Sequence, residues 1–177
     1  MAGPIDESSK SVRPRPRSVT AYCSTWASPW RLSDGAAAAL LASAEFAKEI
    51  GATPLARWVG YAVAGVEPEI MGIGPVPASQ KLLARTGVSI DQIDVIELNE
   101  AFASQAVACI NELGADRSRV NPNGGAIAMG HPIGATGAIL LTKLVHELER
   151  TGKKYGVVTL CIAGGMGIAS VVENMRV

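Results

Sequence analysis

The 177-residue sequence has no surplus of charge of either sign. Its 16 basic and 16 acidic side chains give a formal net charge of zero. A general nucleic-acid-binding protein needs a basic excess, so no nucleic-acid partner is expected. Charged residues make up only 18% of the chain and hydrophobic residues 48%. That balance predicts a buried core and excludes global disorder.

Cysteine is also scarce, and its spacing excludes two kinds of site. Cys23, Cys109 and Cys161 form no C-x-x-C pair, so neither a metal site nor a disulfide framework is indicated. An odd, sparse set of cysteines is typical of a reducing compartment. No apolar run reaches the roughly 18 residues that cross a bilayer, and no apolar signal-peptide segment follows Met1. We therefore expect a soluble cytoplasmic protein with no membrane partner.

Residues 1–32 differ in composition from the rest of the chain. Between residues 10 and 18, Arg alternates with Pro and Ser, a pattern typical of extended, solvated backbone that builds no core. Trp26 and Trp30 follow this run. A basic arm with interleaved aromatic residues can contact nucleic acid. The simpler expectation is an irregular, disordered head.

From Ser33 onward, stretches typical of helices and strands alternate. Ser33 and Asp34 can cap an alanine-rich helix that ends at Gly51. Strands are expected over 55–64, 93–98, 155–160 and 167–173, with a short one over 125–128, and helices over 77–87, 101–113 and 134–150. This alternation predicts an α/β layered domain. Its helices should cover a mostly parallel sheet with an antiparallel final pair.

Three polar side chains are expected just beyond strand ends or in strand–helix loops, where α/β sheets place their sites. Asn99 and Cys161 each follow a predicted strand, and His131 lies in the glycine-rich stretch 121–137. Imidazole titrates near neutrality, so His131 can serve as a general base or an oxyanion donor. Cys161 can move a proton as a thiolate, because amides that follow a strand can lower its pKa. The residues predict an Asn/His/Cys cluster and name no substrate.

Each candidate also has a purely structural interpretation. His131 can join two parts of a loop, Cys161 can be a small buried hydrophobic residue, and Asn99 can cap the following helix. His146 falls on a charged helix face and Cys109 among apolar residues, so neither is assigned a role. The glycine-rich stretch lacks the Lys-Ser/Thr of a phosphate-binding loop and the glycine spacing of a dinucleotide fingerprint.

Three motifs in this chain strongly resemble the C-terminal half of a thiolase. They are N-E-A-F at 99–102, G-G-A-I-A-M-G-H-P-I-G-A-T-G at 124–137 and C-I-A-G-G-M-G at 161–167, in that order. The segments L-S-D-G-A-A at 32–37 and M-G-I-G-P-V-P-A at 71–78 also look like thiolase segments. The resemblance implies a thiolase C-terminal domain at 55–177, with a mixed sheet covered by helices. It also implies that 33–54 is a remnant helix of the N-terminal half.

Thiolases are acyltransferases of fatty acid metabolism that cleave 3-oxoacyl-CoA with CoA, or condense acetyl-CoA units in reverse. The resemblance implies this activity, with coenzyme A as a substrate and no cofactor. His131 would activate the nucleophilic cysteine and hold the thioester oxygen, and Asn99 would position a water in the same oxyanion site. Cys161 would remove and return the α-proton. The amide of Ala163, where glycine is usual, would serve a second oxyanion hole if its φ is negative, and Met71 would line the acyl pocket.

The family's nucleophilic cysteine and its inserted CoA-binding loop domain are not recognisable in the sequence. Cys23 lacks the small-residue context of that nucleophile. We therefore expect a truncated chain with little thiolysis alone, which associates with itself or with a chain that supplies the N-terminal half. The alternative is a non-catalytic thiolase fragment that acts as an interaction module. A ketoacyl-synthase-like enzyme is disfavoured, because that class pairs its nucleophile with two histidines.

Overall fold

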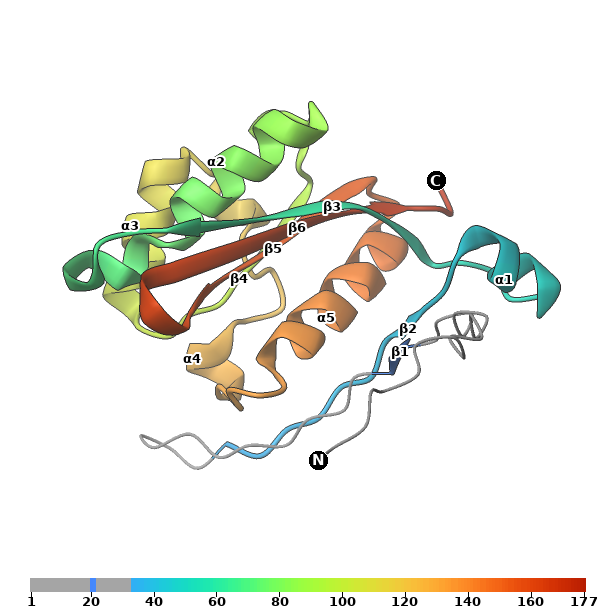
Figure 1. Ribbon diagram of the computed structural model, residues 1–177, viewed down its shortest axis with the longest axis horizontal. Coiled ribbons are helices and arrows are strands. Elements are labelled where there is room, and N and C mark those ends of the chain that lie inside the picture. Colours follow the sequence, from blue (N-terminus) through green and yellow to red (C-terminus); the bar gives the residue numbers. More distant parts are fainter. Residues whose placement is uncertain (1–19, 22–32) are drawn as a thin grey trace, which may run out of the picture.

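The computed structural model describes Thr20, Ala21 and residues 33–177 (Figure 1). The predictions for Cys23 and for the head at 1–32, apart from Thr20 and Ala21, therefore lie outside the described residues. The described chain is built around a four-stranded sheet with the strand order β3-β6-β5-β4. The strands are β3 (Ala56–Gly65), β4 (Val95–Leu98), β5 (Tyr155–Ile162) and β6 (Met166–Asn174).

The sheet is mixed, as the resemblance implied, but it is not mostly parallel. Strand β6 is antiparallel to both of its neighbours, β3 and β5, and only β4 and β5 run parallel. The physical reason is connectivity. A tight turn joins β5 to β6 and enforces an antiparallel pair, whereas a helical crossover joins β4 to β5 and permits a parallel one. The alternation of helices and strands could not reveal that β3 would pair with the last strand.

Helices cover the two faces of the sheet unequally (Figure 1). One face packs against α2 (Pro75–Thr86) and α3 (Ala103–Leu113), where Leu82, Ile96 and Cys109 are buried together. The other packs against α5 (Thr136–Thr151), where Leu144 contacts the cluster that contains Val95. Neighbouring strand residues such as Val95 and Ile96 thus serve opposite faces, as the pleat of a strand requires.

No helix among residues 33–177 is long and apolar enough to cross a lipid bilayer. Short elements complete the described chain. The two-residue strands β1 (Thr20–Ala21) and β2 (Leu40–Leu41) pair with each other. The remaining helices and helical turns are α1 (Ala44–Glu49), η1 (Pro68–Ile73), η2 (Ile90–Gln92), η3 (Arg117–Arg119), α4 (Ala126–Met129) and η4 (Ala163–Gly165).

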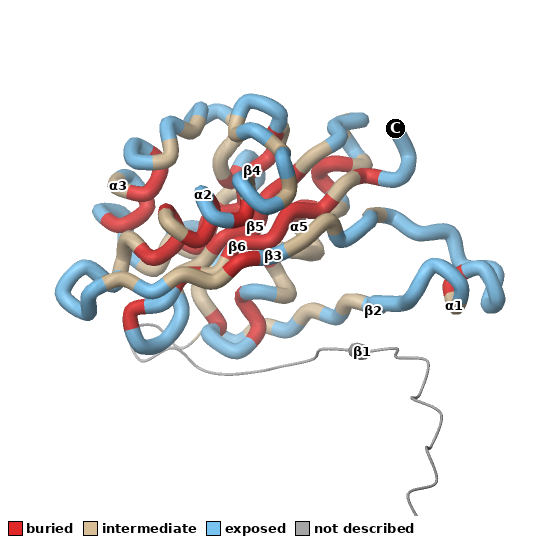
Figure 2. Tube along the Cα trace, turned by 45° about the horizontal axis from the view of Figure 1, so that its top comes forward, coloured by how far each residue is buried: buried red, intermediate tan, exposed pale blue. Residues whose placement is uncertain are grey.

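The prediction of a helix from Ser33 to Ile50 is wrong over most of that range. Residues 33–39 are irregular, and the helix α1 begins only at Ala44, after Ser43 accepts a hydrogen bond from the backbone N–H of Phe46 at 3.1 Å. Figure 2 shows this arm as largely exposed, running beside the sheet and not within it. Alanines favour a helix locally, but a short helix with no apolar face to bury is marginal in water. The division of the chain at residue 55 stays a prediction.

The other correction concerns residues 125–128, which were expected to form a short strand. Gly125 precedes the helix α4, and residues 126–128 belong to it. The Ile127 N–H donates to the carboxylate of Glu100 at 3.1 Å. A carboxylate at the first turn of a helix satisfies a backbone donor that has no partner within the helix. The partner comes from 27 residues earlier in the chain, so no local pattern could have predicted it.

Candidate active site

Asn99 is held at the end of β4 by the main chain of the neighbouring strand. Its N–H donates to the carbonyl of Thr159 at 3.0 Å, and the residue is almost fully buried. Cys161 lies on that neighbouring strand β5, two residues beyond Thr159. Because β4 and β5 are parallel and Leu98 pairs with Thr159, the two candidates lie at the same edge of the sheet. The helix α3 begins at Ala103 without a side-chain cap, so Asn99 is not its N-cap.

Asn121 holds the backbone beside Asn99, and this role was not predicted. Its side-chain Oδ1 accepts from the N–H of Leu98, and its Nδ2 donates to the carbonyl of Leu98, both at 2.9 Å. The amide therefore takes the place of a further strand along the edge of β4. Asn121 has a φ of 46°, in the left-handed region that asparagine tolerates better than most residues. Its position just before Pro-Asn-Gly-Gly is the sequence signal that could have drawn attention to it.

Glu100 links the segment of Asn99 to the loop that carries His131. One carboxylate oxygen accepts from Nδ2 of Asn121 at 2.8 Å, and the other accepts from the N–H of Ile127. A Cβ on Gly125 would lie only 2.2 Å from the carboxyl carbon of Glu100. The carboxylate thus fits against bare backbone, which explains why glycine is needed there.

His131 lies directly beside Asn99, as the sequence predicted. Its Nε2 is 3.4 Å from Nδ2 of Asn99, and its Nδ1 is 2.7 Å from the hydroxyl of Thr136. Burial lowers the pKa of His131, because the charged imidazolium loses hydration. The ring is therefore neutral at neutral pH and has one nitrogen free to accept a proton. His146 lies on the exposed side of α5, 3.7 Å from Glu149, away from this cluster.

The thiol of Cys161 differs from expectation in its protonation. Burial raises its pKa and outweighs a backbone hydrogen bond that lowers it. The expected lowering of the pKa by following amides is therefore wrong, and the thiol is neutral at neutral pH. Cys109 is fully buried, as predicted, and its Sγ contacts the carbonyl of Gly72 at 3.4 Å. Burial and the nearby Cys161 raise the pKa of Cys109 to about 11.

Ala163 and Met71 lie in two turns at the same end of the sheet. Ala163 begins η4, and Asn121 is the only non-glycine residue with positive φ among the described residues. The φ of Ala163 is therefore negative, which meets the condition set for its N–H. Met71 lies in η1, which packs against η4, and the residue is 58% exposed. Its role in an acyl pocket stays a prediction.

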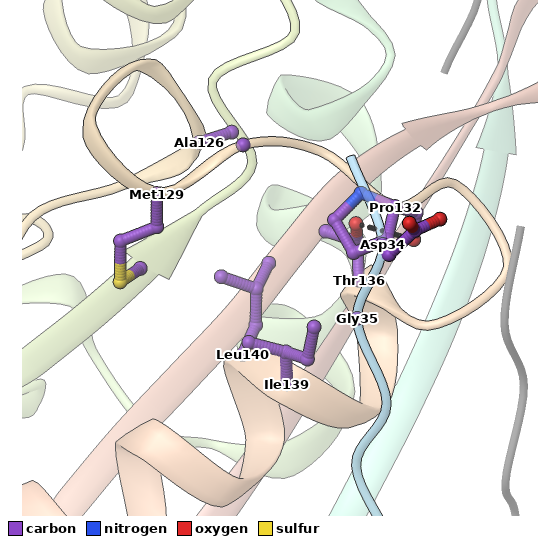
Figure 3. A pocket seen from close by; sticks show the side chains of 9 residues that line it. Asp34, Gly35, Ala126, Met129, Pro132, Thr136, Ile139 and Leu140 are labelled. Carbon is purple, nitrogen blue, oxygen red and sulfur yellow. Dashed lines mark hydrogen bonds between the residues drawn. The ribbon is translucent and has the colours of Figure 1, made fainter. Parts of the chain in front are cut away.

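A small cavity lies behind the loop of His131 (Figure 3). Its volume is about 70 Å³, and Gly35, Pro132, Thr136 and Leu140 are among its lining residues. Ligand sites usually measure about 300 Å³ or more, so this space suits ordered water and no substrate. Among the described residues, no group of three or more His, Cys, Asp or Glu side chains could hold a metal ion.

A larger groove of about 770 Å³ lies between the sheet, the start of α5 and the arm, which contributes Ala39 and Leu41. Its apolar lining includes Trp58 and Tyr61 of β3, Leu160 of β5 and Ile168 of β6. Trp58 and Tyr61 are 43% and 59% exposed. Asn99, His131 and Cys161 do not line it, so the groove and the polar cluster are separate features.

Comparison with known proteins places these features in a family context. The family model described as "Thiolase, C-terminal domain" matches residues 52–174. A beta-ketoadipyl-CoA thiolase of Pseudomonas aeruginosa is 56% identical over 146 residues, which are 81% of this chain and 36% of the relative. An acetyl-CoA acetyltransferase of Chromobacterium violaceum is 54% identical over 143 residues, again 81% of this chain and 36% of the relative.

Solved structures agree with the sequence comparison. The crystal structure of the Bacillus anthracis acetyl-CoA acetyltransferase matches with a TM-score of 0.78 at 49% identity and covers 81% of this chain and 37% of that one. The human mitochondrial 3-ketoacyl-CoA thiolase in complex with CoA matches with a TM-score of 0.79 at 50% identity, over 80% of this chain and 36% of that one. The chain thus spans little more than a third of the length of these relatives.

Proposed function

The chain belongs to the thiolase family, and we propose that it supplies the His131, Cys161 and Asn99 part of an acyl-transfer site that acts on 3-oxoacyl-CoA and CoA. The observation that carries the proposal is the approach of Nδ2 of Asn99 to Nε2 of His131 at 3.4 Å, with Cys161 at the end of the adjoining parallel strand. The names of the relatives support the substrate class, and 3-oxoacyl-CoA is an intermediate of fatty acid metabolism.

In the cleavage direction, each side chain has a defined proton to move. Nε2 of neutral His131 takes the proton of a nucleophilic thiol, and the resulting thiolate attacks the 3-oxo carbonyl. The bond between C2 and C3 then breaks, and Cys161 gives its S–H proton to C2 to release acetyl-CoA. The Cys161 thiolate then takes the proton of a CoA thiol, and the resulting CoA thiolate attacks the acyl group. The nucleophile leaves as a thiol with the proton held at Nε2 of His131. The raised pKa of Cys161 supports this role, since a general acid must hold its proton before the bond breaks.

The remaining roles concern the oxygen atoms of the substrate. Oδ1 of Asn99 is buried without a hydrogen-bond partner among the described residues, which supports a water between Asn99 and the thioester oxygen. The negative φ of Ala163 leaves its N–H available for the acyl intermediate. Cys109 is buried in the core, so we propose that the nucleophile comes from outside residues 33–177 or from a second chain.

A co-expression assay tests this function. The full chain would be purified alone and together with the N-terminal part of the Pseudomonas aeruginosa relative, either as a separate chain or fused to it. CoA-dependent loss of acetoacetyl-CoA absorbance is expected in the combined protein and weakly or not at all in the chain alone. His131→Ala and Cys161→Ala should each abolish it, and His146→Ala should leave it intact. A well-folded fusion without activity would refute the proposal.

A second function, an interaction module without catalysis, is favoured by the uncovered apolar groove. Exposed aromatic side chains that gather on a sheet face are one mark of a protein interface. Either a second copy or a chain with the N-terminal half would cover Trp58 and Tyr61. Light scattering coupled to size-exclusion chromatography separates the outcomes: a monodisperse monomer that also fails to bind the N-terminal part would exclude the module.

A further inference from the structure

Thr136 is the sole residue of the described chain that bonds to Nδ1 of His131, and it has only one proton to give. The hydroxyl oxygen lies 2.7 Å from Nδ1 and 3.0 Å from the carbonyl oxygen of Pro132. A carbonyl can only accept, so the bond to Pro132, which also accepts from the N–H groups of Ala135 and Thr136, uses the Thr136 proton. The hydroxyl then offers a lone pair to the imidazole, and that lone pair needs an N–H at Nδ1.

From this proton count, we propose that Thr136 is a positioning residue that fixes His131 as the Nδ1–H tautomer and keeps Nε2 free as the base. A neutral imidazole carries one proton, so a proton on Nδ1 leaves a lone pair on Nε2. Nδ2 of Asn99, which faces Nε2 at 3.4 Å, is a donor and fits that lone pair. The contacts at both ring nitrogens therefore agree on one tautomer.

The surroundings of Thr136 make this orientation rigid. Thr136 is 3% exposed at the start of α5, and its backbone N–H also donates to the carbonyl of Pro132 at 2.9 Å. The hydroxyl is therefore held in one orientation by buried partners. The carbonyl of Pro132 comes from the residue directly after His131, so the loop, the ring and the helix start form one closed unit.

The catalytic consequence rests on the proposed function, but the tautomer does not. In an acyl-transfer site, a base at Nε2 must be unprotonated before it takes a thiol proton. After the transfer, the ring holds protons on both nitrogens and keeps its bond to Thr136. Loss of the hydroxyl would let the neutral ring place its proton on Nε2, where it cannot act as a base.

Nitrogen-15 NMR of the imidazole rings tests the proposal directly on the full chain. The sequence contains two histidines, so with any affinity tag removed His146 serves as an internal control. At about pH 8, above the usual imidazole pKa, His131 is expected to show a pyrrole-like Nδ1 and a pyridine-like Nε2. Thr136→Val, which keeps the shape but removes the hydroxyl, should produce a mixture of tautomers. Thr136→Ser should restore the single Nδ1–H form, with the His146 signals unchanged throughout.

The outcomes separate the proposal from a merely structural role. A pyridine-like Nδ1 in the unmodified chain would overturn it without any variant. Retention of the pure Nδ1–H form in folded Thr136→Val would overturn it as well, because another feature would then set the tautomer. In the active fusion, Thr136→Val should lower kcat more than it raises KM, with Thr136→Ser close to the parent. An inactive fusion with the expected NMR pattern would refute only the proposed function.

Discussion

Replacement of Asn121 should show how much of the site depends on one side chain. Asn121 makes three side-chain hydrogen bonds, two with Leu98 and one with Glu100. Leu98 is 1% exposed, so water cannot take over its backbone N–H and carbonyl. At about 1 kcal/mol for each bond, Asn121→Gly should lower the free energy of unfolding by roughly 3 kcal/mol.

Asn121→Ala separates the hydrogen bonds from the backbone conformation. Both variants lose the same three bonds, but alanine must also adopt a φ of 46°. The left-handed region costs an L-residue about 1 kcal/mol or more, whereas glycine adopts it freely. The expected loss for Asn121→Ala is therefore roughly 4 kcal/mol. Asn123→Ala is the matched control, since this exposed asparagine makes a single side-chain bond with Glu147 and should cost under about 1 kcal/mol.

Urea unfolding, followed by far-ultraviolet circular dichroism, measures these differences. An Asn121→Gly variant within about 0.5 kcal/mol of the parent would refute the reasoning, because buried backbone groups would then have lost their partners at no cost. Equal stabilities for the glycine and alanine variants would refute the argument from φ. The side-chain amide signals of Asn99 should also shift in Asn121→Gly and stay in place in Asn123→Ala, since Leu98 precedes Asn99.

Three further predictions concern the surroundings of the site. Lys143→Met leaves Glu97, which is fully buried, without its partner at 2.8 Å, and should cost roughly 3 kcal/mol at neutral pH. Burial raises the pKa of Glu97, so Glu97 takes up its proton at a higher pH in the folded protein than in the unfolded chain. The cost should therefore shrink as the pH falls through that raised pKa, and a pH-independent cost in urea unfolding would contradict this. Gly125→Ala should lower the free energy of unfolding by about 1–3 kcal/mol, because the new Cβ overpacks against Glu100. The control Gly137→Ala, whose Cβ meets nothing within 4 Å, should not destabilise the helix. Equal melting temperatures for the two variants would count against the close approach of Glu100 to Gly125. Cys161 should react slowly with iodoacetamide at neutral pH and faster as the pH rises, because its raised pKa keeps the thiol protonated. Peptide mass spectrometry measures the rate of alkylation, and a fast reaction at neutral pH would contradict the prediction.

The correct secondary-structure predictions share a local origin. The strand at 55–64, the helix ends at Gly87 and Gly114 and the final hairpin depend on side chains within a few positions of one another. Both glycines end their helices with positive φ, which the sequence signals directly because glycine adopts it without a Cβ penalty. The same holds for the family motifs, which are runs of neighbouring residues and made Asn99, His131 and Cys161 candidates for the site.

The sequence by itself named Asn99, His131 and Cys161 as candidates for the site, and the tertiary structure decided how they are held and protonated. Asn99 and His131 are 32 positions apart, and their approach depends on Glu100 and Asn121, which join β4 to the loop. The stretch 126–128 became helical because a distant carboxylate caps it. Residues 33–39 are instead irregular and lie against the loop of His131. Burial alone raised the pKa of Cys161 against the local expectation. Each of these outcomes depends on contacts between segments far apart in the chain, which residue patterns do not record.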